Sequence, residues 1–397
     1  MKEVFRLLKI IKNKIGYPGI RTLQSATGPE VMIEDKRILM LGSYNYLGLA
    51  NNKEVKEFAK ASIDKYGIGT GGVRLLTGTM TIHEELEELV SDFTKQEDCI
   101  TIGSGFGTNA GVIPGLMNLL GFKKLVLARK AVIFSDEYNH ASIVDGCKLS
   151  DARVIIFKHN DVNDLEKKIR KYKRYRKLIV SDGVFSMDGD ICRLDKILDI
   201  AKEHDAWTMI DDAHSFGVLG ERGSGTAEYF NRSGEIDINM GTFSKGIGVS
   251  GGFISCKKDL ADYLRVACRP YMFSDSLSPA IAGGIIGSIN YIKKHPELIK
   301  KLKENADYFR TNLNKFGFNT LLSNTQIIPL LVGEDKKTIH FFEELFKNGV
   351  FAPAVRWPAV PRNMGRIRFS ITSEHTIEQL DRALCIVNSI GKEIKLI

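Results

Sequence analysis

The chain has 397 residues, of which 43% are hydrophobic and 26% are charged. These proportions are typical of a folded protein and exclude an intrinsically disordered or fibrous one. The formal net charge is +8, and the run of residues 167–177 alone contains eight Lys or Arg and no acidic residue. The sequence therefore predicts a local basic patch and argues against a surface that is basic all over.

The composition also bears on the compartment. No stretch of about 18 consecutive apolar residues is present, so we expect no membrane-spanning helix. The six cysteines lie 12 to 117 residues apart and form no C-x-x-C pair, which favours reduced core or wall residues over a metal or redox site. Because the N-terminus lacks the small-residue cleavage site of a secretory signal, we expect a cytoplasmic protein that binds no metal.

The first predicted element is an amphipathic helix in the N-terminal segment, which we assign to residues 1–50. Val4, Leu8, Ile11 and Ile15 recur there at helical spacing, with basic residues mainly on the other side. Packing on the protein's own body or on a second subunit is the simpler interpretation. The alternative is peripheral contact with an anionic membrane surface.

Beyond residue 95, short β-rich runs alternate with helix-sized segments. The predicted strands are 99–102, 131–134, 153–157, 178–180, 207–210, 236–240 and 252–256. This alternation predicts an α/β fold with a large domain, residues 51–280, whose mostly parallel sheet is sandwiched by helices.

The basic run at 167–177 precedes one of these strands. Its simplest interpretation is the solvated end of a surface helix that leads into the strand at 178–180. A docking site for an acidic partner is a sharper alternative. Tyr172 and Tyr175 could stack on bases, but we expect no nucleic-acid binding.

After about residue 277 the pattern changes to long amphipathic helices and fewer strands. We expect helices at 281–294, 297–313 and 337–348, and strands at 326–331 and 365–372. This pattern predicts a smaller α+β C-terminal domain over residues 281–397.

Chemistry-bearing residues follow the predicted strands of the large domain, where parallel sheets bind their ligands. Lys245 follows the strand at 236–240, and Thr242 and Ser244 precede it at positions suited to a phosphate. In a confined, glycine-rich site its amine would lose its proton easily enough to act as a nucleophile. A lone Ser-Lys pair is weak evidence, since most lysines are solvated.

A second predicted strand, 207–210, is followed directly by Asp211 and, three residues later, by His214. A buried carboxylate needs a cationic partner, and a protonated pyridine nitrogen would provide one. The alternative is that the aspartate only caps a helix.

Two further motifs complete the set. Residues 103–110, Gly-Ser-Gly-Phe-Gly-Thr-Asn-Ala, form a glycine-rich turn before a probable helix, which suits an anion. His140 follows the strand at 131–134 and could stack on a flat ring, although a lone histidine is more often structural. Together, a lysine, a carboxylate, a stacking imidazole and an anion cradle at one sheet edge are what pyridoxal 5'-phosphate (PLP) requires.

These residues make the chain recognisable, and it resembles the α-oxoamine synthases, a branch of the fold-type I, aminotransferase-like PLP enzymes. The resemblance extends over nearly the whole length. Besides the four motifs above, it includes residues 45–49, 69–74, 183–189, 269–274 and 365–368.

The resemblance implies roles for individual residues. Lys245 would bind the cofactor covalently and later transfer a proton, Asp211 would pair with the pyridine nitrogen, His214 would donate to the ring 3-oxygen, and His140 would stack on the ring. The resemblance further implies that the cofactor is held by Ser104, Gly105, Phe106, Gly107, Asp182, Ser186, Thr242, Ser244 and, from a second subunit, Ser274. The substrate carboxylate would be handled by Asn45, Arg356 and Arg368, since an arginine fork binds a carboxylate bidentately.

The implied reaction is a decarboxylative condensation of a small amino acid with an acyl thioester, giving an α-oxoamine and CO₂. Within the family, segments 41–46, 140–147, 213–215 and 267–271 are most similar to bacterial serine palmitoyltransferase. We therefore expect L-serine and a long-chain acyl-CoA as substrates, which would place the chain in sphingolipid synthesis. The alternatives are 8-amino-7-oxononanoate synthase or glycine C-acetyltransferase activity, with alanine or glycine as acceptor, or an acyl carrier protein as donor, which the basic run would suit.

Three departures from the family pattern concern the substrate pocket. Asp182 stands where the family usually has Glu, Asp275 where Thr or Ala is common, and Trp357 where a proline usually follows the arginine. The resemblance also implies a homodimer whose sites are shared, with residues 69–74 and Ser274 as the candidates that cross between subunits.

Overall fold

The computed structural model describes residues 1–10, 20–124 and 126–397. Ile11 and Ile15 of the predicted N-terminal helix lie outside the described residues. The part that is described forms α1 (Lys2–Ile10), in which no residue is buried. Val4 and Phe5 are each 67% exposed, so α1 does not pack on the described body of its own chain.

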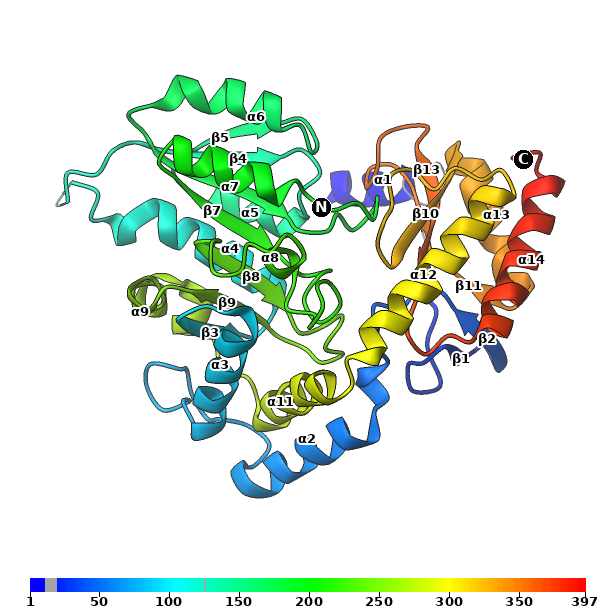
Figure 1. Cartoon of the computed structure of the whole chain (residues 1–397), viewed down its shortest axis with the longest axis horizontal. Coiled ribbons are helices and arrows are strands. Elements are labelled where there is room, and N and C mark those ends of the chain that lie inside the picture. The colour runs from blue at the N-terminus through cyan, green and yellow to red at the C-terminus, as the bar shows by residue number, and fades with distance from the viewer. Residues whose placement is uncertain (11–19, 125) are drawn as a thin grey trace.

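The large domain is built on a seven-stranded sheet, on the left in Figure 1. The strands, all predicted from the sequence, are β3 (Asp98–Ile102), β4 (Ala131–Asp136), β5 (Arg153–Phe157), β6 (Arg176–Asp182), β7 (Ala206–Asp211), β8 (Ile238–Thr242) and β9 (Gly252–Cys256). Their spatial order is β3-β9-β8-β7-β6-β4-β5, and β9 alone runs in the direction opposite to the other six strands. The mostly parallel sheet is confirmed.

Helices cover both faces of this sheet. One layer contains α4 (Gly105–Asn118), α5 (Ala141–Leu149), α9 (Lys258–Ala267) and the short α10 (Arg269–Phe273), packed over residues such as Ile133 and Met209. The other contains α6 (Val162–Ile169), α7 (Leu194–Glu203) and α8 (Thr226–Tyr229), packed over Phe134 and Ile210. Because both faces are covered, β8 is buried at every position, as expected of a central parallel strand.

Three more helices close the lower side of the large domain in Figure 1. These are α2 (Lys53–Tyr66), α3 (Thr81–Thr94) and α11 (Pro279–Lys294). Leu86 of α3 and Ile285 of α11 belong to one apolar cluster with Phe253 of β9. A single-turn 3₁₀ helix at Leu49–Asn51 leads into α2.

The smaller domain combines C-terminal helices with two small sheets. Its helices are α12 (Glu297–Lys315), α13 (Asp335–Lys347) and α14 (Ile377–Glu393), and one sheet is the antiparallel set β10 (Ile327–Gly333), β13 (Gly365–Ser370) and β12 (Ala354–Val355). The other sheet joins β1 (Glu30–Ile33) and β2 (Lys36–Met40) from the N-terminal segment to β11 (Val350–Phe351). Strands β1 and β2 of the N-terminal segment therefore pack with the C-terminal domain.

The basic run does not end as a simple solvated helix. Helix α6 stops at Ile169, a 3₁₀ turn follows at Arg170–Tyr172, and β6 already begins at Arg176. Lys177 is 3% exposed within β6, so one of the eight cations is buried. Its ammonium group donates to the Tyr175 carbonyl oxygen at 2.9 Å.

All six cysteines are free thiols, and five of them are buried; Cys385, on α14, is exposed. Among the described residues, no helix combines the length and the apolar character that crossing a bilayer requires.

Candidate active site

A cavity of about 260 Å³ opens at the carboxyl edge of the seven-stranded sheet. Eleven of the residues predicted from the sequence line it: Ser104, Gly105, Phe106, His140, Asp182, Ser186, Asp211, His214, Thr242, Ser244 and Lys245. They come from the ends of parallel strands and the turns after them, where an α/β sheet places its ligands. Other predicted residues lie outside this lining: Asn45, Gly107, Ser274, Arg356 and Arg368.

Lys245 reaches the cavity from the turn that follows β8. Burial lowers the pKa of its amine to about 8, although the charges of Asp211 and Asp182 oppose this shift. Desolvation disfavours the charged form of a buried amine. Lys245 is therefore much closer to a neutral nucleophile at physiological pH than a surface lysine is.

Asp211, the last residue of β7, is held by two donors. Asn109 donates its side-chain amide to Asp211 Oδ2 at 2.7 Å, and the Ala213 backbone N–H donates to Oδ1 at 3.0 Å. The carboxylate is almost fully buried, at 3% exposure. Its position is thus fixed, and its charge faces the same cavity as Lys245.

Asp182 ends the neighbouring strand β6 and pairs in register with Asp211. Burial, and then the nearby Asp211 charge, raise the pKa of Asp182 well above its usual range. Its Oδ1 atom is buried without a hydrogen-bond partner among the described residues. A buried orphan oxygen at a cavity wall is a position where a bound ligand supplies the missing partner.

His140 and His214 lie on the cavity wall as neutral imidazoles. Burial lowers the pKa of His140, whose Nδ1 lies 2.7 Å from the Ser142 hydroxyl. Burial also holds the pKa of His214 well below its usual range, and its Nδ1 lies 2.8 Å from the Tyr46 hydroxyl. Since each ring has one nitrogen bound to a hydroxyl, its orientation in the cavity is fixed.

The glycine-rich turn forms an anion cradle at the start of α4. Ser104 caps this helix by accepting a hydrogen bond from Gly107 N–H at 3.0 Å. A Cβ atom on Gly105 would lie 3.0 Å from Thr242 Cβ, so the turn and β8 approach more closely than a side chain easily allows. The hydroxyls of Thr242 and Ser244 are 2.9 Å apart beside it. A helix N-terminus, a glycine and two hydroxyls suit a phosphate group.

Arg368 lies next to the cavity without lining it. Its guanidinium donates to the carbonyl oxygen of Ser186, a lining residue, and to the Ser370 hydroxyl at 3.0 Å. Its Nη2 atom is buried and has no partner among the described residues, and Asn45 has a similarly orphaned Nδ2. The unused Arg368 donor next to the cavity fits the predicted role in binding a carboxylate, and the buried Asn45 amide is a second unused donor.

Ser274 and Arg356 lie apart from the lining. Ser274 is exposed at the end of α10, and Arg356 is partly exposed in the segment after β12. Beside Ser274, Ser276 N–H donates to the Gly72 carbonyl oxygen at 3.3 Å, so segments 69–74 and 274–276 lie together.

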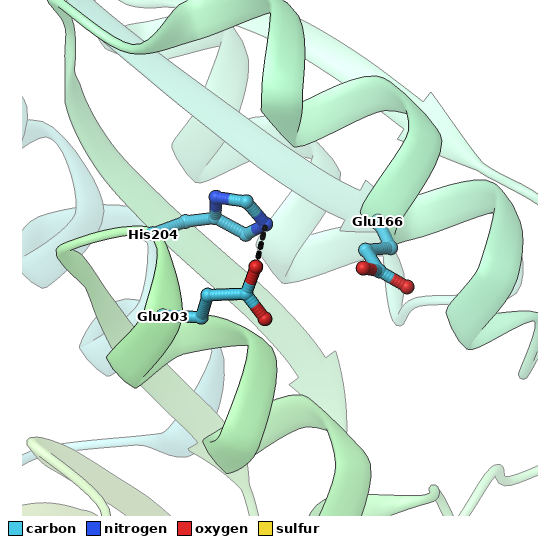
Figure 2. Close-up of side chains that lie close together, drawn as sticks. All are labelled: Glu166, Glu203 and His204. Carbon is cyan, nitrogen blue, oxygen red and sulfur yellow. Dashed lines mark ion pairs between the residues drawn. The ribbon is translucent and has the colours of Figure 1, made fainter.

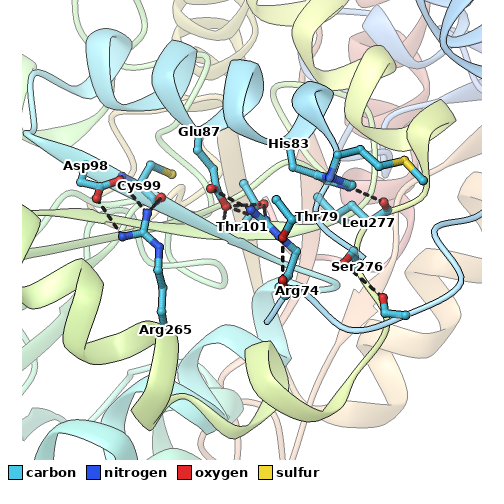
Figure 3. Close-up of polar contacts among 12 residues, drawn as sticks. Arg74, Thr79, His83, Glu87, Asp98, Cys99, Thr101, Arg265, Ser276 and Leu277 are labelled. Atoms are coloured by element: carbon cyan, nitrogen blue, oxygen red, sulfur yellow. Dashed lines mark hydrogen bonds and ion pairs between the residues drawn. The ribbon is translucent and has the colours of Figure 1, made fainter. Parts of the chain in front are cut away.

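A buried network holds the first of these segments (Figure 3). Arg74 makes a bidentate ion pair with Glu87 of α3, at 2.7 and 2.9 Å, and Glu87 also accepts from the hydroxyl and backbone N–H of Thr101. His83, also on α3, lies 2.8 Å from the Leu277 carbonyl oxygen. The two segments expected to reach a second subunit are therefore anchored to α3.

Figure 2 shows a group with metal-ligand spacing, formed by Glu166, Glu203 and His204. Glu166 already makes an ion pair with Arg170. Glu203 and His204 immediately precede β7, at the end of that strand opposite Asp211. This group is therefore separate from the cavity.

Several contributing residues were missed from the sequence. Asn109 and Ser142 both line the cavity, and Tyr46 holds His214. Asn109 and Ser142 stand within motifs quoted above, a few residues beyond the predicted ligands. Their place in the first turns of α4 and α5, pointing back to the sheet edge, is the signal that could have identified them.

The residues present fit PLP. The orphaned Asp182 oxygen, the glycine cradle and a buried lysine of lowered pKa opposite a fixed carboxylate meet the demands of a covalent, phosphorylated pyridine. When bound, PLP supplies an electron sink for a carbanion at the Cα atom of an amino acid. The fold and the site together define a fold-type I, aminotransferase-like PLP enzyme.

Known proteins agree with this class. The family model for aminotransferase class I and II matches residues 36–386. The 8-amino-7-oxononanoate synthase of Thermoanaerobacter pseudethanolicus is 44% identical over 392 residues, which cover 98% of this chain and 97% of that protein.

Solved structures extend the comparison. A lysine-to-alanine variant of serine palmitoyltransferase from S. paucimobilis, with a bound PLP-myriocin aldimine, superposes with a TM-score of 0.91 at 31% identity, covering 100% of this chain and 98% of that one. An 8-amino-7-oxononanoate synthase from Francisella tularensis gives a TM-score of 0.76 at 26% identity, covering 90% of this chain and 98% of that one. The chain belongs to the aminotransferase class I and II family and, within it, to the PLP-dependent acyltransferases called α-oxoamine synthases. The predicted family, fold, enzyme class and cofactor are confirmed.

Proposed function

We propose that this enzyme condenses L-alanine with a pimeloyl thioester, releasing CO₂ and giving 8-amino-7-oxononanoate. The observation that carries the proposal is the 44% identity to an 8-amino-7-oxononanoate synthase over 98% of the chain. The serine palmitoyltransferase that matches in structure is 31% identical. The comparisons thus support the alternative substrate prediction better than L-serine with a long-chain acyl-CoA, and they do not support a role in sphingolipid synthesis.

The proposed roles of the residues follow from their positions. Lys245 would bind the cofactor covalently, and its Nζ atom would also accept the Cα proton of the substrate. Asp211, fixed by Asn109, would pair with the pyridine nitrogen and keep a proton on it. The neutral His140 would stack on the ring and His214 would donate to its 3-oxygen, while Ser104, Thr242 and Ser244 would receive the phosphate.

Substrate recognition is proposed for Arg368 and Asn45. Each has a buried donor atom without a partner among the described residues, and a substrate carboxylate is the acceptor proposed for both. Arg356 is a second proposed carboxylate ligand; it follows β12 directly and precedes Trp357. Replacing Arg368 by Lys keeps the charge but removes the fork, so we expect the KM for the amino acid to rise by about tenfold or more.

A homodimer with shared sites is part of the proposal. The exposed Ser274 lies beside segment 69–74, and both are anchored away from the cavity of their own chain. We expect the holoenzyme to elute as a dimer in size-exclusion chromatography with light scattering. A monomer that is fully active would contradict the shared site.

The substrates are tested by mixing purified holoenzyme with glycine, L-alanine or L-serine and with pimeloyl-CoA or palmitoyl-CoA. Mass analysis should find 8-amino-7-oxononanoate from alanine and pimeloyl-CoA as the main product. The Lys245→Ala variant should form no product, whereas Lys257→Ala, at an exposed lysine before α9, should remain active. Product from serine and palmitoyl-CoA, with none from alanine, would instead establish the serine palmitoyltransferase activity that the TM-score of 0.91 favours.

A further inference from the structure

A loop and a basic cleft lie together at the amino edge of the large sheet, opposite the active-site cavity. We propose that they form a docking surface for an anionic phospholipid bilayer. The surface, called the amino-edge surface below, comprises described residues 119–124, 126–130, 153 and 167–176.

The loop presents apolar side chains to solvent. It links α4 to β4 and extends well beyond the body of the large domain at the left of Figure 1. Leu127 is 90% exposed, Val126 59% and Phe122 57%. Large apolar side chains that stand together on a projecting loop mark an interaction site.

Cations surround these apolar residues. Lys123 and Lys124 lie between Phe122 and Val126 in the sequence, and Arg129 and Lys130 follow Leu127. The C-terminal end of the loop lies against the basic run, because the backbone N–H of Arg176 donates to the Lys130 carbonyl oxygen at 2.9 Å. The apolar tip therefore projects from a continuous basic surface.

A cleft of about 360 Å³ opens at this junction, with Lys130, Arg153 and Arg176 in its lining. The acidic residue in the lining, Asp151, is already bound by Lys123 at 2.5 Å. On this surface, eight cations make no salt bridge to any described residue: Lys124, Lys130, Arg153, Lys167, Lys171, Lys173, Arg174 and Arg176. Their charge is thus available to an anionic partner.

The position of the surface excludes a role in delivering substrate. Ala131, Arg153 and Arg176 begin β4, β5 and β6, whereas the cavity residues Asp182 and Asp211 end their strands. At about 3.3 Å per residue, strands of this length separate the two edges by roughly 15–20 Å through the body of the sheet. A carrier protein bound at the amino edge would face away from the cavity.

Cations beside exposed apolar side chains favour a lipid bilayer over other anionic partners. Lysines and arginines bind phosphate headgroups, and apolar side chains beside them enter the boundary between headgroups and acyl chains. Docking in this way leaves the carboxyl edge, and so the cavity, facing the aqueous phase. A polyanion such as a nucleic acid would use the cations but would leave the exposed apolar tip without a partner.

The test is vesicle co-sedimentation of the full-chain holoenzyme, with phosphatidylcholine alone or mixed with phosphatidylglycerol. We expect binding only to the mixed vesicles, and its loss at high ionic strength. The double variants Val126→Ser/Leu127→Ser and Lys171→Glu/Lys173→Glu should each weaken binding by about tenfold or more while leaving the activity on soluble substrates unchanged. Leu322→Ser, at a residue 80% exposed on the other domain, is the matched control and should bind as wild type.

Three results would overturn the proposal. One is a wild-type enzyme that does not bind anionic vesicles, whether or not it binds heparin or DNA. Another is a Val126→Ser/Leu127→Ser variant that binds vesicles as well as wild type does. The third is loss of binding in Phe5→Ser, with the loop variants unaffected, which would assign the contact to α1.

Discussion

His159 shows how a single residue can join loops that form the site. Its Nδ1 lies 3.1 Å from Asp136 Oδ1, and its Nε2 lies 3.0 Å from Asp190 Oδ2. Asp136 ends β4, four residues before His140, and Asp190 belongs to the loop that carries the lining residues Val184 and Ser186. The imidazole thus connects two walls of the cavity.

The ionisation of His159 predicts a pH-dependent stability. Burial lowers its pKa, but the hydrogen bonds and charges of Asp136 and Asp190 outweigh this and raise it to about 10. Since the unfolded pKa is about 6.5, the stabilisation is complete below that pH and is lost as the pH rises through about 10. At pH about 6, His159→Gln should lose roughly 3 kcal/mol, because two buried carboxylates lose their cation.

Thermal or denaturant unfolding of both proteins across this pH range measures the effect. The difference between them should shrink steadily above pH about 6.5. His204→Gln, at a histidine before β7, serves as the control for replacing a partly buried imidazole. A difference that stays constant with pH would mean that His159 is neutral in the folded protein.

We expect Asn109 to matter for catalysis, although the sequence motifs gave it no role. Replacing it by Ala removes the donor to Asp211, 2.7 Å away, and the bond to the Ser142 hydroxyl at 2.9 Å. A hydrogen bond to a charged group contributes about 1.5–3 kcal/mol, so we expect turnover to fall by roughly 10- to 100-fold. Asn118→Ala, at the other end of α4, should leave turnover unchanged. Equal rates for both variants would show that Asp211 is held without Asn109.

At the scale of elements, helices α2 and α11 are in close contact at a glycine of α11. A Cβ atom on Gly283 of α11 would lie 2.0 Å from the Ser62 hydroxyl and 2.9 Å from the Phe58 carbonyl oxygen of α2. The absence of a side chain there permits the contact. The next residue, Gly284, has room, since its Cβ would lie 3.5 Å from Val249.

These two glycines predict opposite effects of one substitution. Gly283→Ala should destabilise the protein by about 1–3 kcal/mol through overpacking. Gly284→Ala should be neutral or stabilise it by up to about 1 kcal/mol, because alanine favours the helix. Denaturant unfolding of the two variants decides the matter, and a second replacement, Ser62→Ala, should recover part of the loss in Gly283→Ala. If both glycines respond alike, the helices are not in close contact at Gly283.

For the molecule as a whole, the N-terminal segment has two unlike parts. Helix α1 buries none of its residues. Strand β2 pairs with β11, and Leu39 and Leu41 are fully buried in the core of the C-terminal domain, together with Phe369. Strand β2 and Leu41, and not α1, therefore complete the core of the small domain.

This arrangement predicts that deleting α1 and replacing a core residue of β2 have different effects on the free energy of unfolding. Deleting residues 2–10 should leave the free energy of unfolding of the holoenzyme within about 0.5 kcal/mol, as expected for exposed residues. Leu39→Ala should cost about 2–5 kcal/mol, because it opens a cavity in the core. Denaturant unfolding provides both values. A large loss on deleting α1 would show that this helix packs against something, such as a second subunit.

The sequence alone was sufficient to predict the strands of the large sheet and to place Lys245, Asp211 and His140 after the ends of these strands. Hydrophobic runs of strand length and the polar residues after them are local signals, and a parallel sheet brings the ends of its strands to one edge. Strand boundaries were less certain: β8 begins at Ile238 and not at Ile236.

Tertiary structure decided the contacts between residues far apart in the chain. Asn109 meets Asp211 across 102 positions, Tyr46 meets His214 across 168, and β2 pairs with β11. Each of these partners has many possible matches along the chain, and only the packing of the whole core selects one. Local pattern therefore determined which residues carry the chemistry, and long-range packing determined which neighbours hold them in place.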